Sequence, residues 1–332
     1  MINLTPPKFW YKRSIVSYML LPFSFIYRVI IGLRKFYYQI FPGQKFSVPI
    51  IIVGNITVGG TGKTPLVIYL AELLKNKGYN PGIISRGYGG KSKNYPLLVT
   101  PESKVEEVGD EALLIARRTQ CPIVVDPKKT AAARVLFANG NCNVIISDDG
   151  LQHYALSRDI EIALIDVNLG FGNEFCLPAG PLREPITRLQ QVDFIVKNYN
   201  MHFSDDEYGM ILRPIGFYNL KNPAVTKTTN EFNCLDFSRQ TIHAVAGIGN
   251  PQRFFSTLRQ LGLLNVIEHP FPDHYSFRAS DLLFGSEIVI MTEKDAVKCD
   301  TIASENCWCL KIEAKLSDKL TTRVLDKLHK HA

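Results

Sequence analysis

The first 71 residues contain no acidic residue, and the first carboxylate of the chain belongs to Glu72. Seven basic residues fall in the first 45 positions, and they alone account for the formal net charge of +7. Between them the sequence is apolar and aromatic, as in IVSYMLLPFSFIYRVIIGLRKFYYQIF. Such a mixture favours the surface of an anionic bilayer, where each basic residue adds about 1 kcal/mol of attraction. We therefore expect residues 1–45 to form a basic amphipathic segment that associates with a membrane.

The N-terminal segment also lacks an apolar run long enough to cross a membrane. Its uncharged stretch, residues 14–27, has fourteen residues and contains Pro22, whereas a spanning helix needs about 20. We expect the segment to lie in the membrane interface; the alternative is a helix buried against the body of the protein. Nucleic acid is not the expected partner, because the basic residues are embedded in aliphatic sequence.

Cysteine is sparse and irregularly spaced. The seven cysteines include no CxxC pair, and the sequence has no cleavable signal, so a reduced, cytosolic protein without a disulfide framework is expected. The one close pair, Cys307 and Cys309, alternates with Trp308 and Leu310. This alternation favours a buried strand over a pair of zinc ligands.

Short apolar runs alternate with helical patterns from residue 48 onward. Strands are expected at 48–54, 81–85, 122–126, 143–150, 160–167 and 192–198, and helices at 63–78, 109–120 and 128–140. Apolar strands separated by helices indicate a parallel sheet covered on both faces. We therefore expect residues 46–198 to be an α/β nucleotide-binding domain. Polar, turn-rich sequence predicts a linker or hinge at 199–237, and a second alternation predicts a smaller C-terminal α/β lobe at 238–332, with a terminal helix at 319–329.

The stretch NITVGGTGKTP, residues 55–65, follows the first expected strand. Anionic phosphate needs backbone N–H donors in a loop free of side-chain crowding, followed by the positive end of a helix. The lysine can reach the outer phosphates, and the threonine hydroxyl after it can bind magnesium. Thr57 stands where the usual pattern has its first glycine. The expected nucleotide contacts are Thr57, Val58, Gly59, Gly60, Thr61, Gly62, Lys63 and Thr64.

Asp148 and Asp149 end another expected strand, NVIISDDG. In P-loop enzymes a carboxylate at the end of a neighbouring strand completes the magnesium site. Adjacent carboxylates repel one another unless a cation or hydrogen-bond donors offset them, and the alternative is a solvated turn. Gln152 and His153 follow and could line the same mouth.

Two further acidic motifs are ambiguous on their own. Asp110 and Glu111 begin an expected helix, where carboxylates also favour the positive end of the helix dipole without any catalytic role. Asp273 and His274 stand in FPDHYSF, a setting in which histidine is most often a hydrogen-bonded loop residue.

Taken together, the motifs resemble one family. In order along nearly the whole chain, VGNITVGGTGKTP, SRGYGG, VGDE, SDDGLQH, LPAGPLREP, AGIGNPQRFF, FPDHYSF and MTEKDAVK are similar to tetraacyldisaccharide 4′-kinase, the lipid A 4′-kinase of Gram-negative bacteria. Several of these motifs are far more specific than a P-loop, and GGTGKTP is the family's own form of the loop. The resemblance implies transfer of the γ-phosphoryl group of ATP to the 4′-hydroxyl of a tetraacylated disaccharide 1-phosphate, which gives lipid IVA.

The resemblance also implies roles for individual residues. Asp110 matches the proposed catalytic base and His274 its dyad partner, while Lys63 and Thr64 match the phosphate and magnesium contacts. The acidic metal residues are expected to be Asp148 and Asp149, with Glu111 as a further contact. Candidates for orienting substrate or phosphate are Arg86, Tyr88, Gln152 and Arg183.

The implied cofactors are ATP and Mg²⁺, and the implied location is the cytoplasmic face of the bacterial inner membrane, peripheral or monotopic. Because Asp110 and His274 belong to different expected lobes, we expect ATP-linked closure about 199–237 to assemble the dyad. Two alternatives remain open: a P-loop switch or metallochaperone at the membrane surface, and a membrane-binding scaffold with a vestigial nucleotide site.

Overall fold

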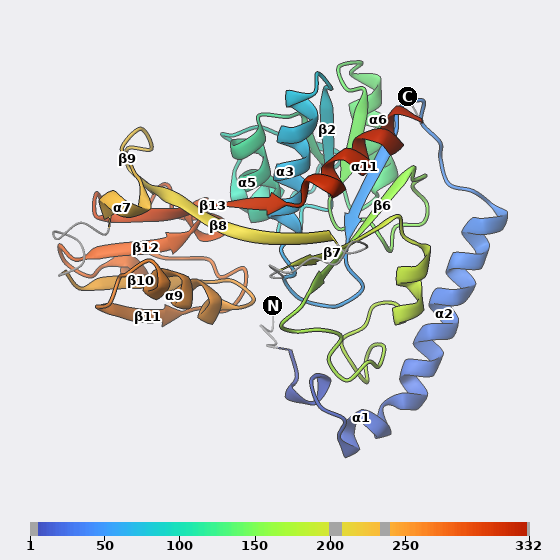
Figure 1. The fold of residues 1–332 in the computed structure, drawn as a ribbon, viewed down its shortest axis with the longest axis horizontal. Coiled ribbons are helices and arrows are strands. Elements are labelled where there is room, and N and C mark those ends of the chain that lie inside the picture. The colour runs from blue at the N-terminus through green and yellow to red at the C-terminus, as the bar shows by residue number, and fades with distance from the viewer. Residues whose placement is uncertain (1–5, 199–207, 233–239, 331–332) are drawn as a thin grey trace.

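The computed structural model describes residues 6–198, 208–232 and 240–330 (Figure 1). The expected strands and helices are present at nearly the expected bounds. The strands are β1 (Ile50–Gly54), β2 (Pro81–Ser85), β3 (Leu97–Val99), β4 (Ile123–Val125), β5 (Val144–Ser147), β6 (Ile160–Asp166), β7 (Phe194–Asn198), β8 (Tyr208–Asn219), β9 (Thr226–Lys227), β10 (Ile242–Ala246), β11 (Val266–Pro270), β12 (Ile288–Thr292) and β13 (Cys307–Leu316). The α-helices are α1 (Ile15–Met19), α2 (Leu21–Ile40), α3 (Lys63–Asn76), α4 (Val105–Val108), α5 (Asp110–Thr119), α6 (Lys129–Ala138), α7 (Thr229–Phe232), α9 (Pro251–Gln260), α10 (Glu293–Ala296) and α11 (Asp318–His329).

The described strands form one sheet in the order β11-β10-β12-β13-β8-β7-β6-β1-β5-β2-β4-β3, with β9 paired to β8. The central strands β7, β6, β1, β5, β2 and β4 are parallel neighbours. Parallel strands align their carboxyl ends at one edge of the sheet, where α/β proteins place their ligands. The loops after β1, β2 and β5 therefore converge on a common region.

Strand β1 is buried on both faces. Ile51 and Val53 pack in a core with α3 and α5, while Ile50 and Ile52 pack in a second core with α6. Alternate side chains of a strand point to opposite faces, so a continuous apolar run is what a sheet covered on both sides requires. The expected α/β class is confirmed.

The expected linker 199–237 needs correction. Residues 199–207 and 233–237 lie outside the described residues, but residues 208–219 form β8, a twelve-residue strand. It pairs with β7 of the larger lobe and, antiparallel, with β13 of the smaller one, so a single sheet runs through both lobes (Figure 1). The polar, turn-rich sequence of this segment did not indicate the strand β8, which joins the two lobes.

The terminal helix was expected to belong to the smaller lobe, and this assignment is wrong. Leu320, Val324 and Leu328 of α11 are buried in the same core as α3 and α5. The hydroxyl of Tyr69 lies 2.9 Å from the hydroxyl of Thr321. The chain therefore returns along β13 to the larger lobe, and its last helix stabilises the nucleotide-binding side.

In β13, Cys307 and Cys309 are buried in one core while Trp308 and Leu310 pack in the core on the other face. The interpretation of this segment as a buried strand is confirmed.

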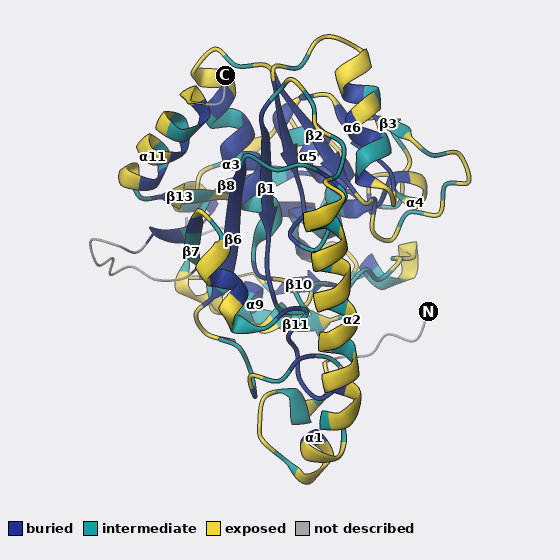
Figure 2. Ribbon diagram, turned by 90° about the vertical axis from the view of Figure 1, so that its right-hand side faces the viewer, coloured by how far each residue is buried: buried dark blue, intermediate teal, exposed yellow. Residues whose placement is uncertain are grey.

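Helices α1 and α2 lie along one side of the molecule, and most of α2 is exposed (Figure 2). Large exposed side chains include Ile15, Met19, Phe23, Phe25, Ile30, Leu33, Phe36 and Ile40. The side facing the protein carries polar groups instead: Ser24 donates to the carbonyl of Cys176 at 2.8 Å, and the Tyr27 hydroxyl donates to the carbonyl of Arg183 at 3.0 Å. The alternative of a helix buried against the domain is thus excluded.

Candidate active site

The loop after β1 has the geometry of a phosphate-binding loop. Gly59 and Gly62 adopt φ of 112° and 91°, a region that favours glycine, and α3 begins at Lys63 directly after them. A side chain at position 62 would also collide with Asn198. Thr57 lies outside the left-handed region, so this position does not need the glycine of the usual pattern.

Asn55 fixes both ends of this loop. Its side-chain amide donates to the Thr57 carbonyl at 2.8 Å, and its Oδ1 accepts from Lys63 Nζ at 3.1 Å. This contact fixes the lysine side chain against the loop, and a side chain already fixed in place lowers the entropic cost of binding phosphate. Sequence analysis assigned no role to Asn55.

Asp149 sits after β5 and faces cations. Nη1 of Arg183 lies 3.0 and 2.9 Å from its two carboxylate oxygens, and Lys63 Nζ lies 3.6 Å away. Burial alone would raise the pKa of Asp149, but Lys63 and Arg183 outweigh it and hold that pKa well below its usual value. Asp149 has φ of 49°, a conformation that costs a non-glycine residue about 1 kcal/mol or more and recurs at functional sites.

Asp148 differs sharply from its neighbour. It is buried, its Oδ2 accepts from Ser85 at 3.3 Å, and its Oδ1 has no hydrogen-bond partner within the described residues. Burial and the charge of Glu111 raise the pKa of Asp148 to about 6. An unpartnered buried carboxylate oxygen is costly unless a cation completes it.

Lys129 is a buried lysine for which no sequence pattern predicted a role. Its Nζ donates to the backbone carbonyl of Asp148 and lies 3.3 Å from Ser147 Oγ. Burial lowers the pKa of Lys129 to about 8, although Asp149 and Asp148 act in the opposite direction. It lies in an otherwise ordinary helix, so only the fold could bring it to the acidic pair.

Gln152 and Arg183 also reach the loop. Gln152 Nε2 donates to the Asn55 carbonyl at 3.0 Å and to Glu184 at 2.8 Å, while the backbone N–H of Arg183 donates to Ile56 at 2.7 Å. Both predicted residues therefore brace the phosphate loop. Glu184, which follows Arg183 in the LPAGPLREP motif, was not predicted.

The predicted dyad is in contact. His274 Nδ1 lies 2.9 Å from Asp110 Oδ2, and Tyr88 packs against the imidazole with ring centroids 4.8 Å apart. Burial would raise the pKa of Asp110, but the hydrogen bond from His274 and the charge of Lys294 outweigh it, so the pKa lies below its ordinary value. The two residues, which come from different lobes, are in contact in this structure; closure of the lobes on ATP binding stays a prediction.

Lys294 links the surrounding acids and was not assigned a role from sequence. Its Nζ lies 3.2 Å from Glu111, 3.1 Å from Asp273 and 3.4 Å from His274 Nε2. An ammonium can only donate hydrogen bonds, so Nε2 of His274 accepts a hydrogen bond from Lys294. The ring proton is therefore on Nδ1, which donates a hydrogen bond to Asp110. Burial acts to lower the pKa of Lys294, but Glu111, Asp110 and Asp273 raise it overall.

The dyad and the phosphate loop belong to one site. A Cβ placed on Gly249 would lie 3.5 Å from Asp273 Oδ2 and 3.7 Å from the backbone nitrogen of Gly60, so the two lobes meet here. Glu111 acts electrostatically on both Asp148 and Lys294. Thr64 stands in the first turn of α3, and Arg86, an exposed residue, follows β2.

Comparison with known proteins identifies the family. The model of the family described as tetraacyldisaccharide-1-P 4′-kinase matches residues 16–329. The chain is 49% identical to the tetraacyldisaccharide 4′-kinase of Coxiella burnetii over 95% of its own length and 93% of the relative's. For the enzyme of Nitrosococcus oceani the identity is 45%, over 98% and 94%.

A solved structure agrees with the fold. The crystal structure titled as the "apo" form of LpxK from Aquifex aeolicus in complex with ATP superposes with a TM-score of 0.79 at 32% identity, covering 95% of this chain and 100% of that one. The chain belongs to the tetraacyldisaccharide 4′-kinase family and is a kinase.

Proposed function

We propose that this kinase transfers the γ-phosphoryl group of ATP to the 4′-hydroxyl of a tetraacylated disaccharide 1-phosphate at a membrane surface, with Asp110 as the base. The observation that carries the proposal is the Asp110–His274 contact of 2.9 Å beside a braced phosphate loop. A charged base next to an activated phosphate is the arrangement that a hydroxyl acceptor needs.

Phosphate binding rests on the loop and its lysine. Backbone N–H groups of residues 59–62 and the N-terminus of α3 attract the phosphates, and Lys63, held by Asn55 and facing Asp149, neutralises charge on the outer ones. Because phosphoryl transfer passes through a loose transition state, positioning and charge stabilisation supply most of the acceleration.

The residues present fit a magnesium ion. Asp148 offers a buried carboxylate oxygen with no hydrogen-bond partner within the described residues, and Thr64 offers a hydroxyl at the start of α3. Magnesium commonly takes one or two protein oxygens and completes its shell with water and phosphate oxygens. It therefore does not need a group of three or more His, Cys, Asp or Glu residues, and the described residues contain no such group that could hold a metal. The ion would neutralise charge on the phosphates. Asp149 and Glu111, paired with Arg183 and Lys294, would support the site from outside.

Deprotonation of the sugar hydroxyl falls to Asp110. Its Oδ1 accepts from the backbone N–H of Glu111 at 2.8 Å and its Oδ2 from His274, so the carboxylate is fixed in orientation and remains ionised at neutral pH. Lys294 holds His274 in the tautomer that donates to Asp110. Tyr88 and Arg86, on the loop after β2, would orient the acceptor sugar.

Helix α2, which exposes many of its apolar side chains, supports membrane docking. No helix in the described residues is long and apolar enough to span a bilayer, yet α1 and α2 expose aromatic and aliphatic side chains continuously. Burying them among acyl chains recovers roughly 25 cal/mol per Å² of apolar surface, and the basic residues of 1–45 meet anionic headgroups. A four-chain lipid would stay in the bilayer, so the enzyme must dock where its hydroxyl emerges. The use of ATP supports docking at the cytoplasmic face of the inner membrane.

A P-loop switch or metallochaperone, the alternative left open by the sequence, is not the function of the family to which the chain belongs. It would use the loop and Asp148 but has no need of the Asp110–His274 pair. The structural observation that supports the kinase is the contact between buried Asp110 and half-buried His274, together with Lys294.

Incubating the purified protein with ATP, Mg²⁺ and disaccharide 1-phosphate lipid tests the proposal. A product carrying a second phosphate at the 4′ position is expected, and Lys63→Ala should abolish it. ATP hydrolysis without any phosphorylated lipid would favour the switch.

A further inference from the structure

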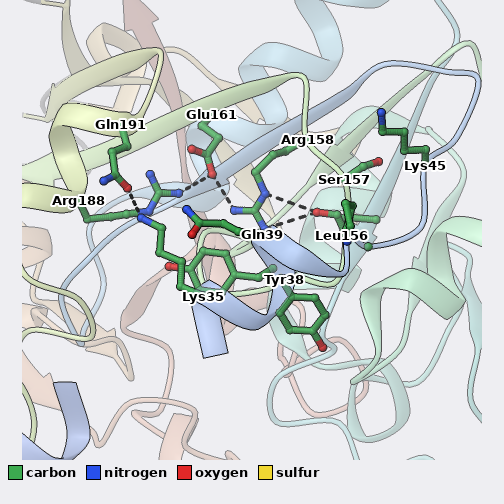
Figure 3. A pocket seen from close by; sticks show the side chains of 13 residues that line it. Lys35, Tyr38, Gln39, Lys45, Leu156, Ser157, Arg158, Glu161, Arg188 and Gln191 are labelled. Carbon is green, nitrogen blue, oxygen red and sulfur yellow. Dashed lines mark hydrogen bonds and ion pairs between the residues drawn. The ribbon is translucent and has the colours of Figure 1, made fainter. Parts of the chain in front are cut away.

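A hollow of about 320 Å³, lined by both charged and apolar groups, lies between α2 and the body of the protein, apart from the catalytic residues (Figure 3). Four cationic side chains and one carboxylate, that of Glu161, line it. The cations are Lys35, Lys45, Arg158 and Arg188.

The two arginines of this hollow are paired with carboxylates, whereas no carboxylate pairs with either of its lysines within the described residues. Arg158 and Arg188 share Oε1 of Glu161 at 2.7 and 2.5 Å, and Nε of Arg188 also lies 3.4 Å from a carboxylate oxygen of Glu184. Lys35 donates to the neutral amide of Gln191, and burial together with the charge of Arg188 lowers the pKa of Lys35. The hollow therefore has the potential of an anion site.

The hollow lies at the opposite end of the strands from the phosphate loop. Arg158 and Glu161 flank the start of β6, and Lys45 precedes β1, whereas the loop follows the end of β1. β1 has five residues, which span roughly 16 Å. An anion here is therefore separate from the phosphates of ATP.

Its position beside α2 determines the kind of anion. Lys35, Tyr38 and Gln39 line the hollow from the same turns of α2 that expose Phe36 and Ile40 outward. If those apolar side chains enter the acyl region, the hollow opens at the level of the headgroups.

We propose that this hollow binds the phosphodiester headgroup of an anionic phospholipid and anchors α2 at the bilayer. The inference rests on the membrane docking proposed above. A series of hydrogen bonds connects the hollow with the phosphate loop. Tyr154 at the edge of the hollow donates to Glu184, and Gln152 donates both to Glu184 and to the carbonyl of Asn55.

The test compares binding to phosphatidylcholine vesicles with and without phosphatidylglycerol, at fixed ionic strength. Lys35→Gln/Lys45→Gln should lose affinity for the phosphatidylglycerol vesicles by about 30-fold, about fivefold for each lysine, with little change for pure phosphatidylcholine. The matched control Lys221→Gln/Lys315→Gln removes the same charge from exposed positions away from α2 and should change binding less than twofold.

A charge-neutral variant separates a pocket from diffuse attraction. Ser157→Phe fills the hollow and leaves every cation in place, so it should remove most of the preference for phosphatidylglycerol; an unchanged preference in a variant with wild-type thermal unfolding would overturn the proposal. If inorganic phosphate raises the Tm of the wild type as much as phosphatidylglycerol vesicles do, the ligand of the hollow is a soluble anion and the lipid proposal is wrong. Wild-type binding to both vesicle types without preference would refute this hollow alone, whereas no binding to either would refute membrane docking itself.

Discussion

Replacing Asp148 by asparagine should abolish kinase activity and yet make the protein more stable at neutral pH. The carboxylate is buried, one of its oxygens has no hydrogen-bond partner in the described chain, and its pKa rises from 3.8 to about 6. At 1.36 kcal/mol for each pKa unit, ionised Asp148 lowers the free energy of unfolding by about 3 kcal/mol. The value is an upper bound, because the Asp148 charge also stabilises the Lys129 ammonium.

The sign of the pH dependence follows from linkage. Below pH 3.8 the carboxyl is protonated in both folded and unfolded chains and contributes nothing; above about pH 6 both are ionised and the folded protein bears the full cost. The free energy of unfolding of Asp148→Asn minus that of wild type should therefore increase between about pH 4 and pH 8.

Thermal unfolding across this pH range measures the effect. With an unfolding entropy of about 2.1 cal/mol/K per residue, 3 kcal/mol corresponds to about 4 °C in Tm for a chain of this length. The control Asp149→Asn should behave differently, because the pKa of Asp149 is lowered: it loses stability by an amount that stays constant between pH 4 and pH 8 and shrinks only below about pH 4. Mg²⁺ with ATP should narrow the gap between wild type and Asp148→Asn. A gap that does not vary with pH would refute the reasoning.

Three further outcomes are expected. Ile30→Ser/Leu33→Ser should leave thermal unfolding nearly unchanged, since both side chains are more than half exposed, but should reduce vesicle binding in a sedimentation assay; wild-type sedimentation would contradict the docking role of α2. Lys294→Gln should lower kcat about 10-fold or more with little change in KM for ATP, because it orients His274 and not the nucleotide; an effect on KM alone would argue otherwise. The rate at limiting Mg²⁺ should fall as the pH drops below about 6, where Asp148 takes up a proton, and a flat profile down to pH 5 would count against Asp148 as the metal residue.

Local patterns determined most of what the sequence could predict. The phosphate loop was predictable because strand, glycines, lysine and helix are consecutive, and the apolar runs located the strands of the parallel sheet. The amphipathic helix of the N-terminal segment was predictable because the segment is both basic and strongly apolar; its association with a membrane stays a prediction.

What the sequence concealed depends on contacts between distant segments. Lys129 belongs to a lysine pair and Lys294 to the MTEKDAVK motif, neither of which indicated a role for the residue. Only the fold brings them to Asp148 and His274. The strand β8 was hidden in turn-rich sequence, because pairing on both sides stabilises it more than its own propensity does. The pairing of Asp110 with His274, 164 residues apart, was accessible only through the family resemblance.

The most direct test of the catalytic account is single-turnover transfer of the γ-phosphoryl group to the lipid by Asp110→Ala, measured beside its affinity for ATP. Asp110 contacts His274 and not the phosphate loop, so we predict that transfer is lost by a factor of 10² or more while ATP affinity stays within about twofold. Transfer at a near-normal rate would show that Asp110 is not the base.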